Sequence, residues 1–499
     1  MLNLINLACA QRGIFNTFVM EPERLIRSSC QQCAQAIEFP AEGVGMTATC
    51  PHCGRTTVLC EETNPMQPAE ILSAGELKAA FADAIPRSRI SIFYQLALFL
   101  VAIFMILLPI IYVGFVASAI CGVYWYAVHA KVLFSGFAGG VYVFLFKLVV
   151  YFGPLFGGTV AILFMFKPLF ARSPKRPEAL TLNPALEPKL FQFIAHVSDL
   201  LSAPMPKRID LNCELNASAG FRRGWLSFFG NDLVLSIGLP LVAGMDIRQF
   251  AAVLAHEFGH FTQGTAMRFG YIIGRIDRWF VRVVYERDSW DEALDDWSNS
   301  VEDSRLAIIL WCAHIAIWFS RQILKLLMLC GHAVSCFLSR QMEFHADSCA
   351  INVSGSEKFE TMLIRLREQS VLHSLAYQGF QHFWEKKHQV PDNIPEYLIK
   401  LENQMPANFH EQARNTLLNE TAGLWATHPT AAQRIQKCRQ QEATGIFHLE
   451  LPATALFSDF IGTSRTVTYM HYCESLRLPM TPAMVKPVQF FFKDTAVEA

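Results

Sequence analysis

The sequence predicts an α+β protein that is mainly helical and built in several parts. Two CxxC pairs stand near the N-terminus, and two long apolar blocks follow in the first third. The stretch "FAAVLAHEFGHF" (residues 250–261) then has helical periodicity and carries two histidines, close to short alternating strands. The 499 residues suffice for two or three domains. We expect folded parts at 26–62, 90–167 and 180–440, with 441–499 as a C-terminal extension of no assigned role.

The composition argues against two classes of protein. The chain has 42 basic and 43 acidic residues, so its charge predicts no nucleic-acid partner. Its 14 cysteines are too sparse for a secreted disulfide framework and favour a reducing compartment. The N-terminal stretch also lacks the basic start and the apolar run of a signal peptide.

The cysteine pairs have the spacing of a metal site. Sixteen residues separate the first pair, Cys30 and Cys33, from the second pair, Cys50 and Cys53. Two thiolates in one tight turn can hold one side of a tetrahedral ion, so two such pairs predict a four-cysteine zinc ribbon. Four protein ligands leave no open position, which indicates a structural zinc. The competing interpretation is four incidental reduced cysteines.

The apolar blocks predict insertion into a lipid bilayer. No Asp, Glu, Lys or Arg occurs between Ile90 and Ala130, and only Lys147 interrupts the block from Val132 to Phe166. A helix crosses a bilayer with roughly 20 apolar residues. We expect two tilted spans, at about 93–120 and 140–166 by that length criterion, in preference to two hairpins.

The flanking charges predict the orientation of these spans. Arg87 and Arg89 precede the blocks, and Lys167 and Arg172 follow them. An even number of spans places both flanks on one side, and basic flanks stay in the cytoplasm. We therefore expect an integral protein of a bacterial-type inner or plasma membrane, with the ribbon and everything after residue 167 facing the cytoplasm.

The part after residue 180 contains the candidate site. "RIDLNCELNA" alternates, with Ile209, Leu211 and Cys213 on one face, and "NDLVLSIG" (231–238) reads as a second strand. Asp246 then caps a helix, with Gln249 three residues on as its partner.

His256 and His260 are one turn apart on that helix, so both rings can hold one zinc ion. Glu257 is rotated by about 100° from His256 and can reach a water molecule without being a ligand. His-Glu-x-x-His on a helix is the signature of a zinc peptidase.

A third ligand is expected in "SRQMEFHADSCA", where Glu343 and Asp347 share one helix face. Glu343 would complete the ligand set and Asp347 would orient a ligand histidine, while His345 points away and is interpreted as structural. His428 in "THPTAAQRI" could stabilise a developing oxyanion or be an ordinary surface histidine.

HEFGH, SRQMEFHAD and THPTAAQRI, in this order after two apolar blocks, resemble the HtpX-like membrane zinc endopeptidases, a group that includes the CaaX prenyl proteases. The resemblance covers roughly 180–440 and implies a zincin-like (gluzincin) domain with a small sheet. It implies His256, His260 and Glu343 as zinc ligands, Glu257 as general base, and supporting roles for Asp347 and His428. "NASAG" also resembles the family's cleft strand, which implies that Asn216 and Ala217 bind substrate backbone.

The resulting hypothesis is a membrane-anchored zinc metalloendopeptidase with one catalytic and one structural Zn²⁺, acting on protein substrates in membrane-protein quality control. The alternative is a non-catalytic partner-binding protein that uses its ribbon on a peptidase scaffold. A protease for lipid-modified peptides ranks lower, because such enzymes enclose a chamber with more spans. For 306–338 we favour one long helix on or dipping into the membrane over a second hairpin. The sequence sets neither the oligomeric state nor the cleavage preference.

Overall fold

The structure is a computed structural model. It describes residues 25–29, 36–40, 47–49, 56–58, 73–81, 92–134, 140–170, 179–221, 232–262, 265–286, 292, 295–296, 300, 304–421, 423, 426 and 428–492. The first strands are β1 (Leu25–Ser29), β2 (Ala36–Pro40), β3 (Thr47–Thr49) and β4 (Thr56–Val58), which pair as two antiparallel hairpins. In the sequence, one CxxC pair follows β1 and the other follows β3. Cys30, Cys33, Cys50 and Cys53 lie outside the described residues, so the ribbon stays a prediction.

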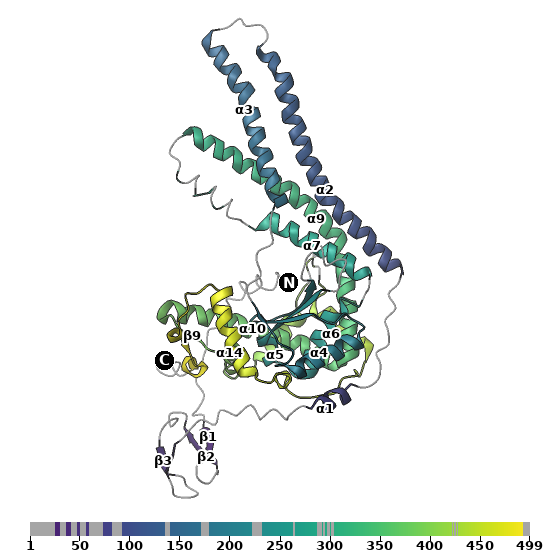
Figure 1. The fold of residues 1–499 in the computed structure, drawn as a ribbon, viewed down its shortest axis with the longest axis vertical. Coiled ribbons are helices and arrows are strands. Elements are labelled where there is room, and N and C mark those ends of the chain that lie inside the picture. The colour runs from purple at the N-terminus through teal and green to yellow at the C-terminus, as the bar shows by residue number, and fades with distance from the viewer. Residues whose placement is uncertain are drawn as a thin grey trace.

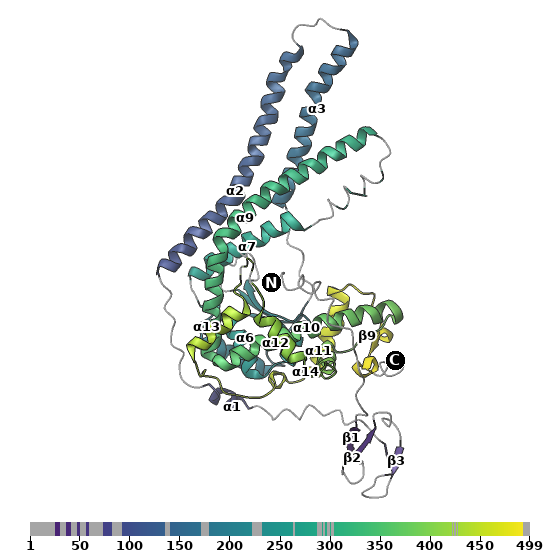
Figure 2. The same ribbon diagram turned by 180° about the vertical axis from the view of Figure 1, so that it is seen from behind.

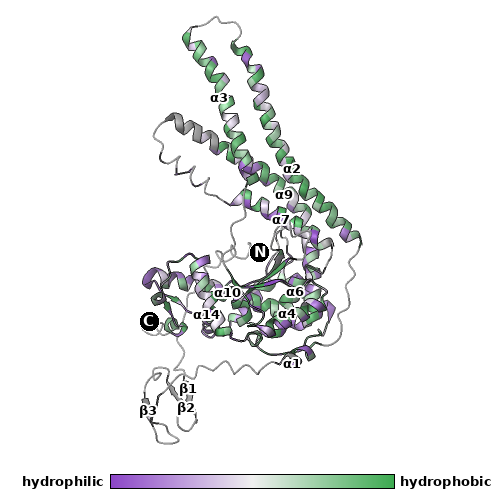
Figure 3. Ribbon diagram, viewed as in Figure 1, coloured by the Kyte–Doolittle hydropathy of each residue, from purple (hydrophilic) through white to green (hydrophobic). Residues whose placement is uncertain are grey.

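Each apolar block forms one continuous helix. α2 (Ile92–His129) and α3 (Val141–Phe166) lie side by side and extend away from the part of the chain that contains the sheet (Figure 1). Both are mostly hydrophobic in Figure 3, and both are long and apolar enough to cross a membrane. α2 is longer than its predicted span because no charged side chain occurs before its end.

A third helix of this kind is α9 (Ser304–Ser354), whose segment His314–Ser354 is also long and apolar enough to cross a membrane. Length and composition alone support that statement. The hydroxyl of Tyr112 in α2 donates to the carbonyl of Met165 at 2.8 Å and lies 2.7 Å from the hydroxyl of Ser320. This buried contact joins α2, the end of α3 and α9 at one point.

α7 (Thr265–Tyr285) is strongly amphipathic and closes the junction between these helices and the rest of the chain. Its buried residues, including Ile272, Ile276 and Phe280, belong to one apolar cluster with Leu98 of α2 and Leu324 of α9. Figures 1 and 2 both show α7 at this junction.

The small sheet has four strands in the order β5-β6-β8-β7. They are β5 (Leu180–Thr181), β6 (Arg208–Asn212), β7 (Ala217–Phe221) and β8 (Leu233–Gly238), with β6 parallel to β8 and β7 antiparallel to it. Ile209 and Leu211 are buried as expected. Asp210 is buried too, because it accepts hydrogen bonds from the Thr181 hydroxyl and the Arg208 guanidinium.

Helices pack on this sheet around one apolar core. Its fully buried aromatic side chains include Phe193, Phe250, Phe258, Phe359 and Phe447. The remaining elements are α1 (Ala74–Ala79), α4 (Pro188–Leu200), α5 (Leu239–Ala243), α6 (Ile247–Gly259), α10 (Ser356–Lys387), β9 (Val390–Pro391), α11 (Ile394–Glu402), α12 (Phe409–Leu418), α13 (Ala431–Gln441), α14 (Phe460–Met470) and β10 (Val485–Lys486).

The segment after α13 belongs to the same folded unit. Residues 443–453, which we name the C-terminal strap, join the start of α6 to the end of α9. The Ile247 amide donates to the Leu451 carbonyl at 2.8 Å, and the Phe447 amide donates to the Val353 carbonyl at 3.0 Å. Further along, Val467, Tyr472 and Phe491 enter the main core, and β10 pairs with β9.

Candidate metal centre

The helix that carries both histidines is fixed at its start by local interactions. Asp246 and Gln249 form the predicted capping box, in which each side chain accepts from the other residue's amide. Phe250, Leu254 and Phe258 are fully buried in the core. The capped and buried helix therefore holds its C-terminal end, where the histidines lie, in one orientation.

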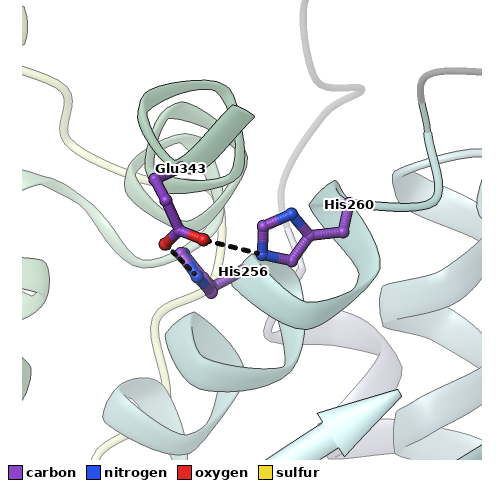
Figure 4. Close-up of side chains that lie close together, drawn as sticks. All are labelled: His256, His260 and Glu343. Atoms are coloured by element: carbon purple, nitrogen blue, oxygen red, sulfur yellow. Dashed lines mark ion pairs between the residues drawn. The ribbon is translucent and has the colours of Figure 1, made fainter. Parts of the chain in front are cut away.

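The second contributing helix is α9, which crosses α6 at very short range. Gly259 lies at the crossing, and a Cβ there would stand 2.9 Å from the Cα of Ala346 and 3.2 Å from the Cβ of Cys349. Only glycine permits this approach without a shift of one helix. The short crossing brings Glu343 of α9 over the histidines of α6 (Figure 4).

Three potential ligand atoms converge there. His256 Nε2 lies 3.5 Å from Glu343 Oε2, and His260 Nε2 lies 3.7 Å from Glu343 Oε1. The three groups offer ligand atoms that all lie within 4.8 Å of one another. Zn–N and Zn–O bonds near 2.1 Å in a tetrahedron place ligand atoms about 3.4 Å apart. Two imidazoles and one carboxylate at these separations therefore fit a zinc ion with one position left open.

Glu257 is adjacent to this group but points towards β7. Its Oε2 accepts a hydrogen bond of 3.3 Å from the amide of Ala219. Burial raises the pKa of the Glu257 carboxyl to about 7, against the opposing effect of His256. A carboxylate with a pKa in that range can both take up and release a proton near neutral pH.

The two histidines differ in their electrostatic surroundings. Burial by itself lowers the pKa of His256, but the contacts with Asp347 and Glu343 outweigh it and raise the pKa to about 10. Burial lowers the pKa of His260 to about 4, and the neighbouring His256 adds to that effect. The two carboxylates therefore favour the protonated form of His256, whereas a histidine binds a metal ion as the neutral ring.

Asp347 lies on the far side of His256 from the ligand atoms. Its Oδ1 is 3.0 Å from His256 Nδ1, which leaves Nε2 directed at Glu343. Arg434 of α13 donates to both oxygens of Asp347, from Nε at 2.9 Å and from Nη2 at 2.5 Å. Arg434 stands in the same THPTAAQRI stretch as His428, but the sequence alone predicts no role for it.

The remaining predicted residues are His428, Asn216 and Ala217. His428 Nδ1 is 3.2 Å from Glu343 Oε1, and the His428 side chain is 55% exposed. Asn216 accepts from the Gly238 amide at 2.8 Å, and Ala217 begins β7 at the edge of the sheet. The structure thus brings together His256, His260, Glu343, Asp347 and His428. No described contact joins Asn216 or Ala217 to them, and the chemical role of each predicted residue stays a prediction.

A second group of possible ligands consists of Glu368, Glu402 and His410, which no sequence motif indicates. Arg365 donates to both carboxylates, and His410 Nδ1 lies 2.9 Å from Glu368. Because these opposite charges are already paired with one another, we assign no metal to this group.

The comparisons with known proteins agree with this geometry. The model for peptidase family M48 matches residues 184–442. The chain is 24% identical over 254 residues to a protein named protease HtpX from Acinetobacter baylyi. The aligned region is 50% of this chain and 70% of that protein. The chain is also 25% identical over 316 residues to protease HtpX from Pseudomonas syringae pv. tomato, covering 62% and 91% respectively. No solved structure matches.

The expected resemblance is therefore confirmed. The matched region includes both helices that meet at Gly259, as well as α13 with Arg434. The relatives carry the name of a protease, and the described part of this chain has three helices long and apolar enough to cross a membrane. The chain belongs to peptidase family M48 and is an HtpX-like, membrane-associated metallopeptidase.

Proposed function

We propose that the chain is a zinc-dependent endopeptidase that cleaves peptide bonds of protein substrates beside a membrane. The observation that carries the proposal is the convergence of His256, His260 and Glu343. Glu257 follows His256 directly in the sequence, and its carboxylate is held by the Ala219 amide. A zinc ion held there would polarise a carbonyl group and lower the pKa of a water molecule.

Glu257 is proposed as the general base. It takes a proton from the attacking water, and it then delivers that proton to the departing amine. Its hydrogen bond from the Ala219 amide fixes the carboxylate while leaving one oxygen for this transfer. The raised pKa of Glu257 supports the assignment, because the group must be both a base and an acid within one turnover.

Two further contributions come from His428 and from β7. His428 is exposed and stands beside Glu343, so it can turn its ring towards a substrate and donate to a developing oxyanion. β7 is an edge strand, and Asn216 and Ala217 lie at its start. An extended substrate could pair with β7 antiparallel to it, which would pass the substrate across Glu257.

The location follows from the apolar helices. α9 contributes Glu343 and also contains a candidate membrane span, so we propose that the site lies close to the membrane surface. The basic residues that flank the first two spans support a site that faces the cytoplasm. Membrane proteins in quality control are the substrates that fit this position. We also propose a second, structural zinc on Cys30, Cys33, Cys50 and Cys53, supported by their spacing and by two strand hairpins in the same region.

The test uses full-length protein purified in detergent. Zinc content per chain is measured together with cleavage of casein, with and without a chelator, for the wild type and for Glu257→Gln. We expect about two zinc ions per chain, from one catalytic and one structural site, cleavage that the chelator stops, and a variant that keeps its zinc but cleaves nothing. Full activity of Glu257→Gln would exclude Glu257 as the base.

A further inference from the structure

Arg434 stands behind the candidate metal centre without touching any of the three ligand side chains in the described contacts. It comes from α13, whose start is fixed by a capping box between Thr430 and Gln433. Its guanidinium lies over the ring of Phe359, 5.7 Å from the centroid. Its only hydrogen-bonded partner among the described residues is Asp347, which is 2% exposed.

The contact between Arg434 and Asp347 uses both carboxylate oxygens. A guanidinium that donates from Nε and from Nη2 restrains a carboxylate in its plane as well as in position. The same Oδ1 that accepts from Arg434 also faces His256 Nδ1 at 3.0 Å. The orientation of the His256 ring is thus set through Asp347 by a residue in a third helix.

We propose that Arg434 is a positioning residue that locks Asp347, and through it His256, in the orientation required for metal binding. This inference rests on the proposed function, because it takes His256 as a ligand. A buried carboxylate without its cation would lose its fixed orientation, and the His256 ring could then turn Nε2 away from Glu343. Arg434 therefore determines how tightly and in what geometry the metal is held.

The chain offers a matched control on the same helix. Arg439 in α13 also donates from Nε and Nη2 to both oxygens of one acid, Glu360, at 2.7 and 2.5 Å. Its side chain is 59% exposed, and no described contact links this pair to the metal-binding side chains. Arg439→Gln therefore removes a two-oxygen arginine–carboxylate pair from the surface of the same helix and should leave the orientation of His256 unchanged.

The experiment measures metal binding by full-length protein in detergent, without reference to cleavage. Zinc affinity is obtained by competition with a chelator, and the visible spectrum is recorded after loading with Co²⁺. The difference between the wild type and His260→Ala isolates the signal of this site from that of the ribbon cysteines. Arg434→Gln should bind zinc about 10- to 100-fold more weakly and change the Co²⁺ spectrum. A lysine cannot hold both carboxylate oxygens, so the zinc affinity of Arg434→Lys should lie between those of the wild type and Arg434→Gln. Arg439→Gln should have the zinc affinity and the Co²⁺ spectrum of the wild type.

Two results would overturn the inference. Wild-type affinity and an unchanged spectrum in Arg434→Gln would show that Arg434 only stabilises the fold. If Arg434→Gln does not fold, wild-type metal binding by Arg434→Lys decides the question in the same way. A wild type whose metal binding equals that of His260→Ala would instead reject the proposed metal site itself, so the two failures are distinguishable.

Discussion

Replacement of Gly259 by Ala tests whether the crossing of α6 and α9 sets the metal geometry. The new Cβ would lie 2.9 Å from the Cα of Ala346, whereas carbon atoms in ordinary contact are at least about 3.5 Å apart. The obstructing atom belongs to the backbone of α9, so the helices must separate by roughly 0.6 Å at the crossing. Metal–ligand distances tolerate changes of about 0.2 Å. Glu343, one turn from Ala346, therefore moves beyond the tolerance of the site.

The expected result is a loss of zinc affinity that exceeds the loss of stability. Overpacking costs about 1–3 kcal/mol, so the free energy of unfolding should fall by about that amount. Zinc affinity should fall on the order of 10-fold or more, as for other changes that displace a ligand. Chelator competition measures the affinity and thermal unfolding measures the stability.

Gly157→Ala in α3 is the control, because nothing lies within 4 Å of a Cβ at that position. It should leave zinc affinity at the wild-type level. Equal affinities for Gly259→Ala and the wild type would refute the reasoning, since they would mean that the helices separate without moving Glu343.

Three further predictions concern the base, the strap and the ribbon. Burial raises the pKa of Glu257 to about 7, and a general base acts when deprotonated, so kcat/KM should fall as the pH decreases through this range. The positive charge of bound zinc shifts this acid limb of the pH profile to lower pH. An acid limb above about pH 8 would therefore contradict the role of Glu257 as the base. Gly445→Ala should destabilise the protein by about 2 kcal/mol or more. The φ angle of Gly445 is +78°, and the new Cβ would lie 2.4 Å from the Gly355 amide nitrogen. An unchanged melting temperature would show that the C-terminal strap is not constrained at this position. Cys30→Ser with Cys33→Ser should lower the zinc content from about two to about one per chain and leave the chelator-sensitive cleavage, whereas unchanged zinc content would remove the ribbon metal from the proposal.

The features that could be predicted from the sequence depend on short-range patterns. The capping box at Asp246, the spacing of His256 and His260, and the four-residue spacing of Glu343 and Asp347 are local, and the structure gives each the helical setting expected of it. The two long apolar helices can also be predicted from the sequence, because a membrane helix must be apolar along its whole length.

Other features depend on how distant helices meet, which no local pattern determines. Arg434 and Asp347 are 87 residues apart, and their pairing requires α13 to pack on α9. The role of Gly259 is visible only once Ala346 lies against it. α9 runs without a break through the two apolar stretches of 306–338, because the Arg321 and Lys325 between them are good helix formers, and it continues beyond them to Ser354.

The continuity of α9 couples the apolar region to the metal centre. Ser320 contacts Tyr112 where α2, α3 and α9 meet, and Glu343 lies 23 residues further along the same helix, about 34 Å at 1.5 Å per residue. Between them Gly331 packs against Leu108 and Met105, where a Cβ would stand 2.8 Å from a Leu108 methyl carbon. A packed helix transmits displacement because close-packed contacts leave little room for local adjustment. We therefore expect that a change in how α2 and α3 pack on α9 also displaces Glu343, the carboxylate of the candidate zinc site.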